Sequence, residues 1–128
     1  MPFFTGLSNL ACINVCASMK LKHFLATAED PEMIMEEGAD CEEMYIVVEG
    51  SRSVMLERDR VKLGFLSTGD FFGELGALLP PAMIQQRRRT RTAYAVAEMQ
   101  VGVLSYDDLM KLRRESFEVN VKVTTYTS

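Results

Sequence analysis

Short apolar runs separated by turn-forming residues fill the sequence from residue 22 onward. We interpret five of them as strands: residues 33–35, 44–48, 53–56, 61–66 and 71–72. Turn-forming residues break the chain at 30–31, 38–40, 49–50, 58–59 and 67–69. Turns at intervals of roughly eight to twelve residues are typical of β-sandwiches and jelly rolls. Residues 91–104 continue the pattern as a predicted hairpin that turns near Ala97 and Glu98.

A helical segment is predicted for residues 1–22, with Ser8 or Asn9 as the N-cap. Its apolar residues keep helical spacing and predict a face that packs on the core: Leu10, Ile13, Ala17 and Leu21. Cys12 and Cys16 lie four residues apart, and we interpret them as buried reduced thiols rather than metal ligands. His23, the single histidine, is interpreted as a strand or helix-end residue.

A second helix is predicted to begin after Ser105, which caps it, with two acids in the first turn. Its expected apolar face consists of Leu109, Leu112 and Phe117. After Asn120 the composition is poor for a helix. We therefore expect residues 105–128 to hold one C-terminal helix, too short a tail for a complete lid, and the end of the sequence suggests a fragment of a longer protein.

The length of 128 residues predicts one domain, and 48% hydrophobic with 25% charged residues is typical of globular proteins. Neither a signal peptide nor a membrane-spanning run is evident. The odd cysteine count of three favours a reducing compartment, and the net charge of −4 disfavours nucleic acid as the main partner. Charge is uneven, since residues 29–43 hold eight acids and no base, which we interpret as a solvated face or a contact with another molecule.

The residues that suggest a binding site lie in the stretch 69–79. Gly73 and Gly76 allow a bend and a close approach to the backbone, and a helical turn there would present the amides of Leu75, Gly76 and Ala77 to an anion. Glu74 would repel a bare anion but would accept a hydrogen bond from a hydroxyl beside it. Arginines follow at 87–89 and 91. Together these features predict a site for a phosphate next to a ribose, against the alternative of an ordinary turn with a solvated acid.

These residues resemble the phosphate-binding cassette of cyclic-nucleotide-binding domains, most similar to those of ion channels. The likeness rests on residues 72–79, on the glycine-marked strands at 34–40, 44–50 and 63–66, and on the strand-to-helix junction at 101–110. It implies a mainly β fold with flanking helices, a β-roll of about eight strands. It also implies a sensor of cAMP or cGMP rather than an enzyme, and the sequence shows neither a catalytic constellation nor a metal cluster.

The resemblance assigns the ligand site to Phe72, Gly73, Glu74, Leu75, Gly76, Ala77, Arg89, Thr90 and Arg91. Glu74 would take the ribose hydroxyl. Counting back without gaps from residues 101–105 makes Arg89 the phosphate contact, followed by Thr90. A shift of two residues makes Arg91 the phosphate contact instead. Arg89 and Arg91 would share one face of a strand. We interpret Arg87 and Arg88 as a solvated loop.

The channel-like junction implies a cytoplasmic domain of a membrane protein, within a larger and possibly tetrameric channel, with no cofactor and no insertion into the membrane by this part. Two alternatives stay open. The link at 80–86 is longer than usual in the family and would lift the arginines from the pocket, which leaves an assembly module that binds no nucleotide. A DNA-binding regulator of the bacterial type is favoured least, because no helix-turn-helix follows.

Overall fold

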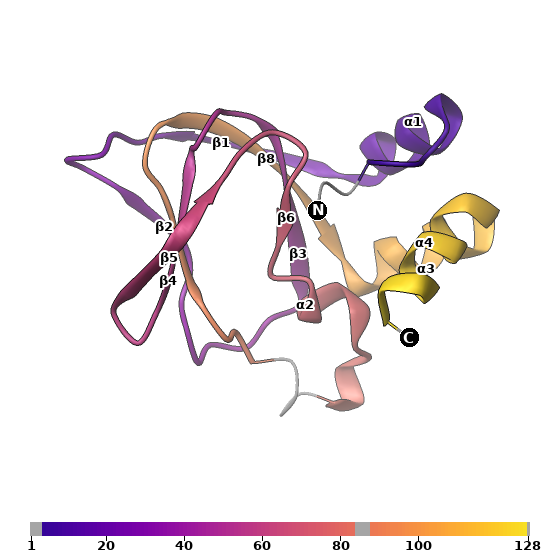
Figure 1. Cartoon of the computed structure of the whole chain (residues 1–128). Coiled ribbons are helices and arrows are strands. Elements are labelled where there is room, and N and C mark those ends of the chain that lie inside the picture. The colour runs from indigo at the N-terminus through magenta and orange to yellow at the C-terminus, as the bar shows by residue number, and fades with distance from the viewer. Residues whose placement is uncertain (1–3, 84–87, 128) are drawn as a thin grey trace.

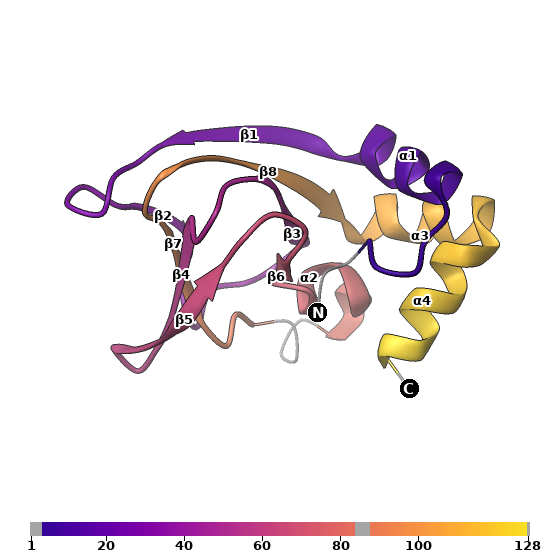
Figure 2. The ribbon, with the colours of Figure 1, turned by 45° about the horizontal axis from the view of Figure 1, so that its top comes forward.

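The computed structural model describes residues 4–83 and 88–127. Eight strands form two four-stranded antiparallel sheets, and helices gather at one end of them (Figures 1 and 2). The elements are α1 Asn9–Ser18, β1 Lys20–Leu25, β2 Glu32–Met35, β3 Glu43–Glu49, β4 Val54–Arg58, β5 Val61–Leu66, β6 Phe71–Phe72, α2 Leu75–Leu78, the 3-10 turn Pro81–Met83, β7 Thr92–Ala95, β8 Glu98–Ser105, α3 Tyr106–Glu115 and α4 Phe117–Thr127. The mainly β fold with flanking helices is confirmed.

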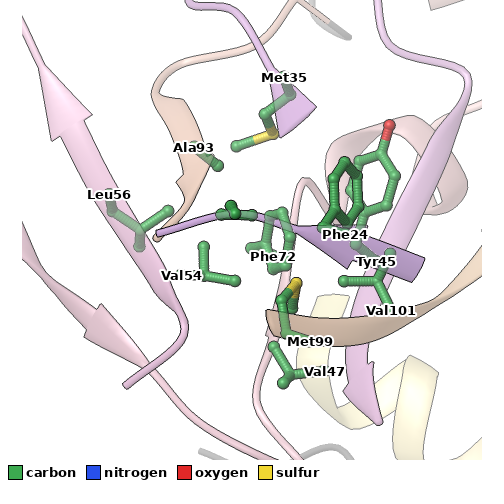
Figure 3. Packing of buried hydrophobic residues seen from close by; sticks show 12 residues of the cluster. Phe24, Met35, Tyr45, Val47, Val54, Leu56, Phe72, Ala93, Met99 and Val101 are labelled. Atoms are coloured by element: carbon green, nitrogen blue, oxygen red, sulfur yellow. The ribbon is translucent and has the colours of Figure 1, made fainter. Parts of the chain in front are cut away.

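The strand order is β1-β8-β3-β6 in one sheet and β2-β7-β4-β5 in the other. Side chains from both sheets meet in an apolar core, in which Val47, Val54, Ala93, Ala95 and Val101 are fully buried (Figure 3). This core follows from the period-two alternation of the strands, which sends every second side chain inward.

A second core lies between the first sheet and the helices. Met44, Ile46 and Leu104 from the sheet meet Leu109 and Leu112 from α3, and all five are buried. The N-cap Ser8 accepts a hydrogen bond from the Ala11 amide, and Ser105 forms a capping box with Asp108. Both caps were predicted, since serine in that position supplies an acceptor for an otherwise unpaired amide.

The predicted face of the first helix is wrong. Ala11 and Val15 face the core, whereas Leu10 is 68% and Ile13 63% exposed. The helix also ends at Ser18, because residues from Lys20 onward pair with β8 as a strand, so the predicted helical segment 1–22 ends early.

The predicted hairpin over 91–104 is also wrong. β7 pairs with β2 and β4, whereas β8 pairs with β1 and β3, so the two strands lie in different sheets. The chain crosses between the sheets at Val96 and Ala97, where the Val96 amide donates to the Ser53 carbonyl at 2.9 Å. Local spacing could not reveal this, because a two-residue break serves a hairpin and a crossing between sheets equally well.

The C-terminal tail forms two helices instead of one. α4 runs through the stretch that composition marked as poor for a helix, and Phe117 is 82% exposed instead of packing on the core. Val119 and Val123 are buried, and Arg113 of α3 donates to the side chains of Asn120 and Thr124 at 2.8 and 3.1 Å. Packing against α3 therefore overrides weak helix propensity.

Candidate functional site

A cavity of about 920 Å³ is lined by residues of both sheets, of α2, of the segment 88–91 and of α4. Its lining includes most of the predicted site: Phe72, Gly73, Glu74, Arg89, Thr90 and Arg91. Apolar side chains from both sheets form the rest of its inner wall, including Met35, Leu56 and Leu66. The topology thus brings the glycine turn and the arginine segment together, as the sequence predicted.

The glycine turn follows β6, whose Phe72 pairs with Tyr45 of β3 and stacks on its ring at 5.1 Å between centroids. Gly73 has φ +65°, and a Cβ there would lie 2.6 Å from Nη1 of Arg89. Only glycine suits both demands, because other residues adopt this backbone rarely and the side chain would collide with the arginine.

The predicted amide cradle of Leu75, Gly76 and Ala77 falls on the short helix α2. The Ala77 amide, which was expected to face the anion, instead donates to the Glu74 carbonyl at 3.1 Å, and the Leu78 amide does so at 3.0 Å. The amides of Leu75 and Gly76, at the start of this turn, remain the predicted donors to an anion. Glu74 is half-buried and lines the cavity.

Arg89 is 7% exposed and is fixed by the backbone. Its Nη1 donates to the carbonyls of Gly73 and Glu43 at 2.8 and 3.0 Å. Its Nη2 lies 3.5 Å from the Tyr45 hydroxyl, and the guanidinium carbon lies 5.3 Å from the centroid of that ring. Among the described residues no carboxylate forms an ion pair with it. A buried cation held only by neutral groups lacks the counter-charge that usually compensates burial.

The main chain of Arg89 is held as well. Its amide donates to the Ala39 carbonyl at 2.8 Å, and its carbonyl accepts from the Gly38 amide at the same distance. This pairing with the loop before β3 places Arg89 at the cavity, so the long link has not lifted it away. Of the link, residues 84–86 lie outside the described part, as does Arg87.

Arg91 and Thr90 differ from Arg89 in being exposed, although both line the cavity. Residues 88, 90 and 91 are bends and β7 begins only at Thr92, so the prediction that Arg89 and Arg91 share one face of a strand is wrong. The exposure of Arg88 fits the predicted solvated loop, and Arg88 also donates to the Gly38 carbonyl at 3.1 Å and lies 3.7 Å from Asp40.

Tyr45 contacts Arg89 but does not line this cavity; with Arg89 it lines a neighbouring hollow that also includes Met35 and Glu43, and sequence reasoning missed this contact. Its hydroxyl donates to Glu43 Oε1 at 3.0 Å. Burial, followed by the negative charge of Glu43, raises the pKa of Tyr45 to about 12. The hydroxyl therefore stays protonated at neutral pH. Its place in an apolar strand gave no signal of this role, since tyrosine is common in such strands.

The outer wall comes from α4, which contributes Lys122, Val123 and Thr125 to the cavity lining. The tail was expected to be too short for a full lid, yet its second helix reaches the cavity. Lys122 donates to the Thr5 carbonyl at 2.6 Å, and the Ser8 amide donates to Glu118 at 3.3 Å. These contacts tie α4 to the segment that precedes α1.

The other candidate residues stand apart from the cavity, except for Cys41. Cys12 is half-buried and Cys16 is exposed, so the expectation of two buried thiols on α1 is wrong; Cys41 is the buried cysteine and lines the cavity. His23 lies on β1, as expected, with Nε2 3.2 Å from Glu98. In the described part of the chain no group of three potential ligands is arranged to hold a metal ion. No described helix is long and apolar enough to cross a membrane.

Comparison with known proteins identifies relatives of two kinds. The chain is 30% identical over 89 residues to the cAMP-activated global transcriptional regulator Vfr of Pseudomonas aeruginosa, which covers 67% of this chain and 41% of the relative. It is 28% identical over 97 residues to the cAMP-dependent protein kinase type II regulatory subunit of Drosophila melanogaster, which covers 74% of this chain and 23% of the relative. The chain thus spans less than half the length of these curated relatives.

Solved structures share the fold. The crystal structure of the Thermus thermophilus catabolite activator protein superposes with a TM-score of 0.80 at 22% identity, covering 99% of this chain and 56% of that one. The N-terminal domain of a Streptomyces coelicolor transcriptional regulator gives 0.76 at 23% identity, covering 97% and 84%. Residues 27–116, which include the cassette, the arginine segment and both sheets apart from β1, match the family described as the cyclic nucleotide-binding domain. The chain is a member of that family, a regulatory ligand-binding domain rather than an enzyme.

Proposed function

We propose that the cavity binds cAMP or cGMP and that the domain passes the binding event to an attached effector. The observation that carries the proposal is Arg89, a buried guanidinium at the cavity with no carboxylate partner among the described residues. The phosphate of a cyclic nucleotide would supply the missing negative charge. The volume of about 920 Å³ falls in the range of pockets for small molecules.

In this proposal Arg89 contacts the phosphate through the part of its guanidinium that the backbone leaves available. Nη1 has two protons, and the carbonyls of Gly73 and Glu43 accept them. The Nε proton and the Nη2 protons form a second edge with the spacing of a bidentate phosphate contact. Because Nη1 is anchored, that edge is oriented before the ligand arrives.

In the same proposal, Glu74, which lines the cavity, accepts a hydrogen bond from the ribose hydroxyl. The amides of Leu75 and Gly76, at the start of α2, donate to the phosphate. Arg91, exposed at the rim, adds positive charge without a fixed geometry. Such a cation steers an anionic ligand more than it orients it.

The relatives bear on the kind of effector to which the domain is attached. The strand-to-helix junction at 101–110 favoured an ion channel, but the relatives named above are a transcriptional regulator and a kinase regulatory subunit. These relatives give the channel no support, and they raise the transcriptional alternative that the sequence favoured least. We propose that the domain belongs to a larger protein that acts either as a transcriptional regulator or as the regulatory subunit of a kinase.

Titration calorimetry with cAMP and with cGMP tests the binding proposal, with thermal unfolding as a second readout. We expect saturable binding, and an upward shift of the unfolding temperature, since a ligand at 100 times its Kd stabilises the native state by about 2.7 kcal/mol. Adenosine, which lacks the phosphate, is the control and should bind far more weakly. If neither nucleotide gives heat or a thermal shift at millimolar concentration, the chain is an assembly module that binds no nucleotide.

Thr90 bears on the choice between the two nucleotides. It lines the cavity beside Arg89, and its hydroxyl can donate to the phosphate or to the purine. The resemblance to channel domains associates threonine here with tolerance of cGMP. We expect cGMP to bind at least as tightly as cAMP, and Thr90→Ala to lower the cGMP affinity more than the cAMP affinity. A strong preference for cAMP that Thr90→Ala leaves unchanged would contradict this assignment.

A further inference from the structure

Arg89 uses only part of its guanidinium to hold its own place. A guanidinium has five N–H donors, one on Nε and two on each Nη. Both Nη1 protons go to the carbonyls of Gly73 and Glu43. The proposed phosphate contact uses the Nε proton and one Nη2 proton. The second Nη2 proton remains, and its acceptor among the described residues is the Tyr45 hydroxyl, 3.5 Å from Nη2.

Tyr45 is suited to accept this proton because its own proton is used elsewhere. The hydroxyl donates to Glu43 Oε1 at 3.0 Å, which leaves its lone pairs for Nη2. Burial, followed by the charge of Glu43, raises the pKa of Tyr45 to about 12, so the hydroxyl keeps its proton at neutral pH. Glu43 therefore acts on Arg89 through Tyr45, although the described side chains of Glu43 and Arg89 form no direct ion pair.

The Tyr45 ring is held by packing that does not depend on the hydroxyl. Tyr45 is buried in the core between the sheets, and its ring stacks on Phe72 (Figure 3). Phe72 directly precedes Gly73, whose carbonyl also holds Arg89. The guanidinium carbon lies within the range of a cation–π contact with the Tyr45 ring. Removal of the hydroxyl alone should therefore leave the ring in place.

We propose that Tyr45, oriented by Glu43, is a positioning residue that holds the guanidinium of Arg89 so that its Nε–H and Nη2–H edge faces the phosphate. This inference rests on the proposed binding of a cyclic nucleotide. Tyr45 does not line the nucleotide cavity, so it acts through Arg89 and touches no part of the ligand. A contact of 3.5 Å is long for a hydrogen bond, so its loss should weaken binding less than the loss of Arg89.

Tyr45→Phe removes the hydroxyl and keeps the ring. We expect the Kd values for cAMP and cGMP to rise by the same factor, about three- to tenfold, because both ligands carry the phosphate. The Kd for adenosine, measured by competition, should stay within about twofold. Tyr94→Phe, at a half-buried tyrosine of β7 outside the cavity, is the matched control and should change none of the three. Equal weakening of adenosine and both nucleotides would indicate a merely looser pocket and would overturn the proposal.

A double-substitution cycle tests whether Tyr45 acts through Arg89. In an Arg89→Ala background, Tyr45→Phe should change the Kd for cAMP by less than about twofold, since the group that it positions is gone. The same loss in both backgrounds would overturn the proposal. Thermal unfolding of each variant shows whether the variants remain folded.

NMR of 15N-labelled arginine side chains measures the same effect without ligand and without substitution of Arg89. Rotation of the Arg89 guanidinium about its Nε–Cζ bond should be slow, because both Nη groups are held. Tyr45→Phe and Glu43→Ala should each accelerate it by about twofold or more, whereas Tyr94→Phe should not. Unchanged rotation in Tyr45→Phe would overturn the positioning role, and unchanged rotation in Glu43→Ala would overturn the part of Glu43.

The outcomes also separate this inference from the proposed function. If the unsubstituted chain binds neither nucleotide, the proposed function fails and the positioning role fails with it. If the unsubstituted chain binds and Tyr45→Phe binds equally well, the positioning role alone is overturned. Weaker binding of both nucleotides, with adenosine unchanged, supports both.

Discussion

The two walls of the cavity are held in different ways. The inner wall joins the glycine turn, β3 and the arginine segment through Arg89, which is buried and bonded to two backbone carbonyls. The outer wall is α4, which packs on α3 through the buried Val119 and Val123, while its hydrogen bonds to residues 5–8, through Glu118 and Lys122, are exposed. Buried hydrogen bonds to a charged group stabilise by about 1.5 to 3 kcal/mol, whereas exposed ones contribute far less.

This difference between the walls gives them different roles in the proposal: the inner wall recognises the nucleotide and the outer wall responds to it. The groups proposed to hold the phosphate are already in place without ligand, so binding does not need to order them. α4 is instead held on α3 by the apolar packing of Val119 and Val123, and it also contacts the segment leading into α1. A ligand that touches both walls would therefore link the fixed guanidinium of Arg89 to the helical end of the molecule.

Loss of Arg89 should have the largest effect. Arg89→Ala is expected to weaken nucleotide binding at least tenfold, since a charge-assisted bond is lost and two buried carbonyls lose their donor. Arg91→Ala should weaken binding less, because its guanidinium is exposed at the rim. Calorimetric titration measures both, with Arg114→Ala, at an exposed arginine of α3 that does not line the cavity, as the matched control. A larger loss at Arg91 would mean that the shifted register identifies the phosphate contact.

Substitution of Gly73 should have the second largest effect on nucleotide binding. Gly73→Ala introduces a Cβ at φ +65° and 2.6 Å from Nη1 of Arg89. We expect a loss of about 1 to 2 kcal/mol in the free energy of unfolding from the backbone strain alone, together with weaker nucleotide binding because the guanidinium must move. Gly6→Ala, at φ +83° with open space around it, carries the strain alone. Urea unfolding and titration of both variants separate the two effects; unchanged nucleotide affinity in Gly73→Ala would show that Arg89 adapts freely.

The outer wall should tolerate change. Lys122→Ala removes the exposed bond to the Thr5 carbonyl, which is worth at most about 1 kcal/mol, so the Kd should change no more than about fivefold. The rate of nucleotide release, measured by stopped flow with a fluorescent analogue, should increase. Lys111→Ala on the exposed face of α3 serves as the control. A loss as large as that of Arg89→Ala would show that both walls take part equally in recognition.

The pH dependence of stability should be absent near neutral pH and should appear only in alkaline solution. Tyr45 has a pKa of about 12 in the folded protein against 10.0 ordinarily, so folding favours its neutral form. Its contribution is fully present below pH 10 and is lost as the pH rises from 10 to 12. Chemical unfolding across that range should show a decline that Tyr45→Phe reduces and Tyr94→Phe does not. An identical decline in both variants would place the titrating group elsewhere.

The strands of the β-roll could be predicted because the sequence patterns that mark them are local. Alternating side chains and turn residues located β2 to β6 within a few residues, and Gly73 and Glu74 were assigned to the site from the surrounding motif and its resemblance to the family's cassette. The route of the chain between sheets was not local. β7 and β8 looked like a hairpin because no residue at 96–97 indicates which neighbouring strand each will pair with.

The packing of the helices could not be predicted from the sequence, for another reason. Periodicity shows that a helix has an apolar stripe but not which of two apolar stripes faces the core, and α1 has two. α4 has weak propensity and forms because its valines pack on α3. In the site, the carbonyls that hold Arg89 have no sequence signature at all, since every residue has one.

The pairing of Arg89 with Gly38 and Ala39 has a consequence for how this domain tolerates changes in length. The arginine is located by the strand-like bonds it makes with a distant loop, not by how many residues precede it. Insertions and deletions between Leu79 and Arg88 can therefore accumulate without moving the charge, as long as the link can still reach. Sequence alignments that keep this stretch gapless will therefore misjudge which residues correspond.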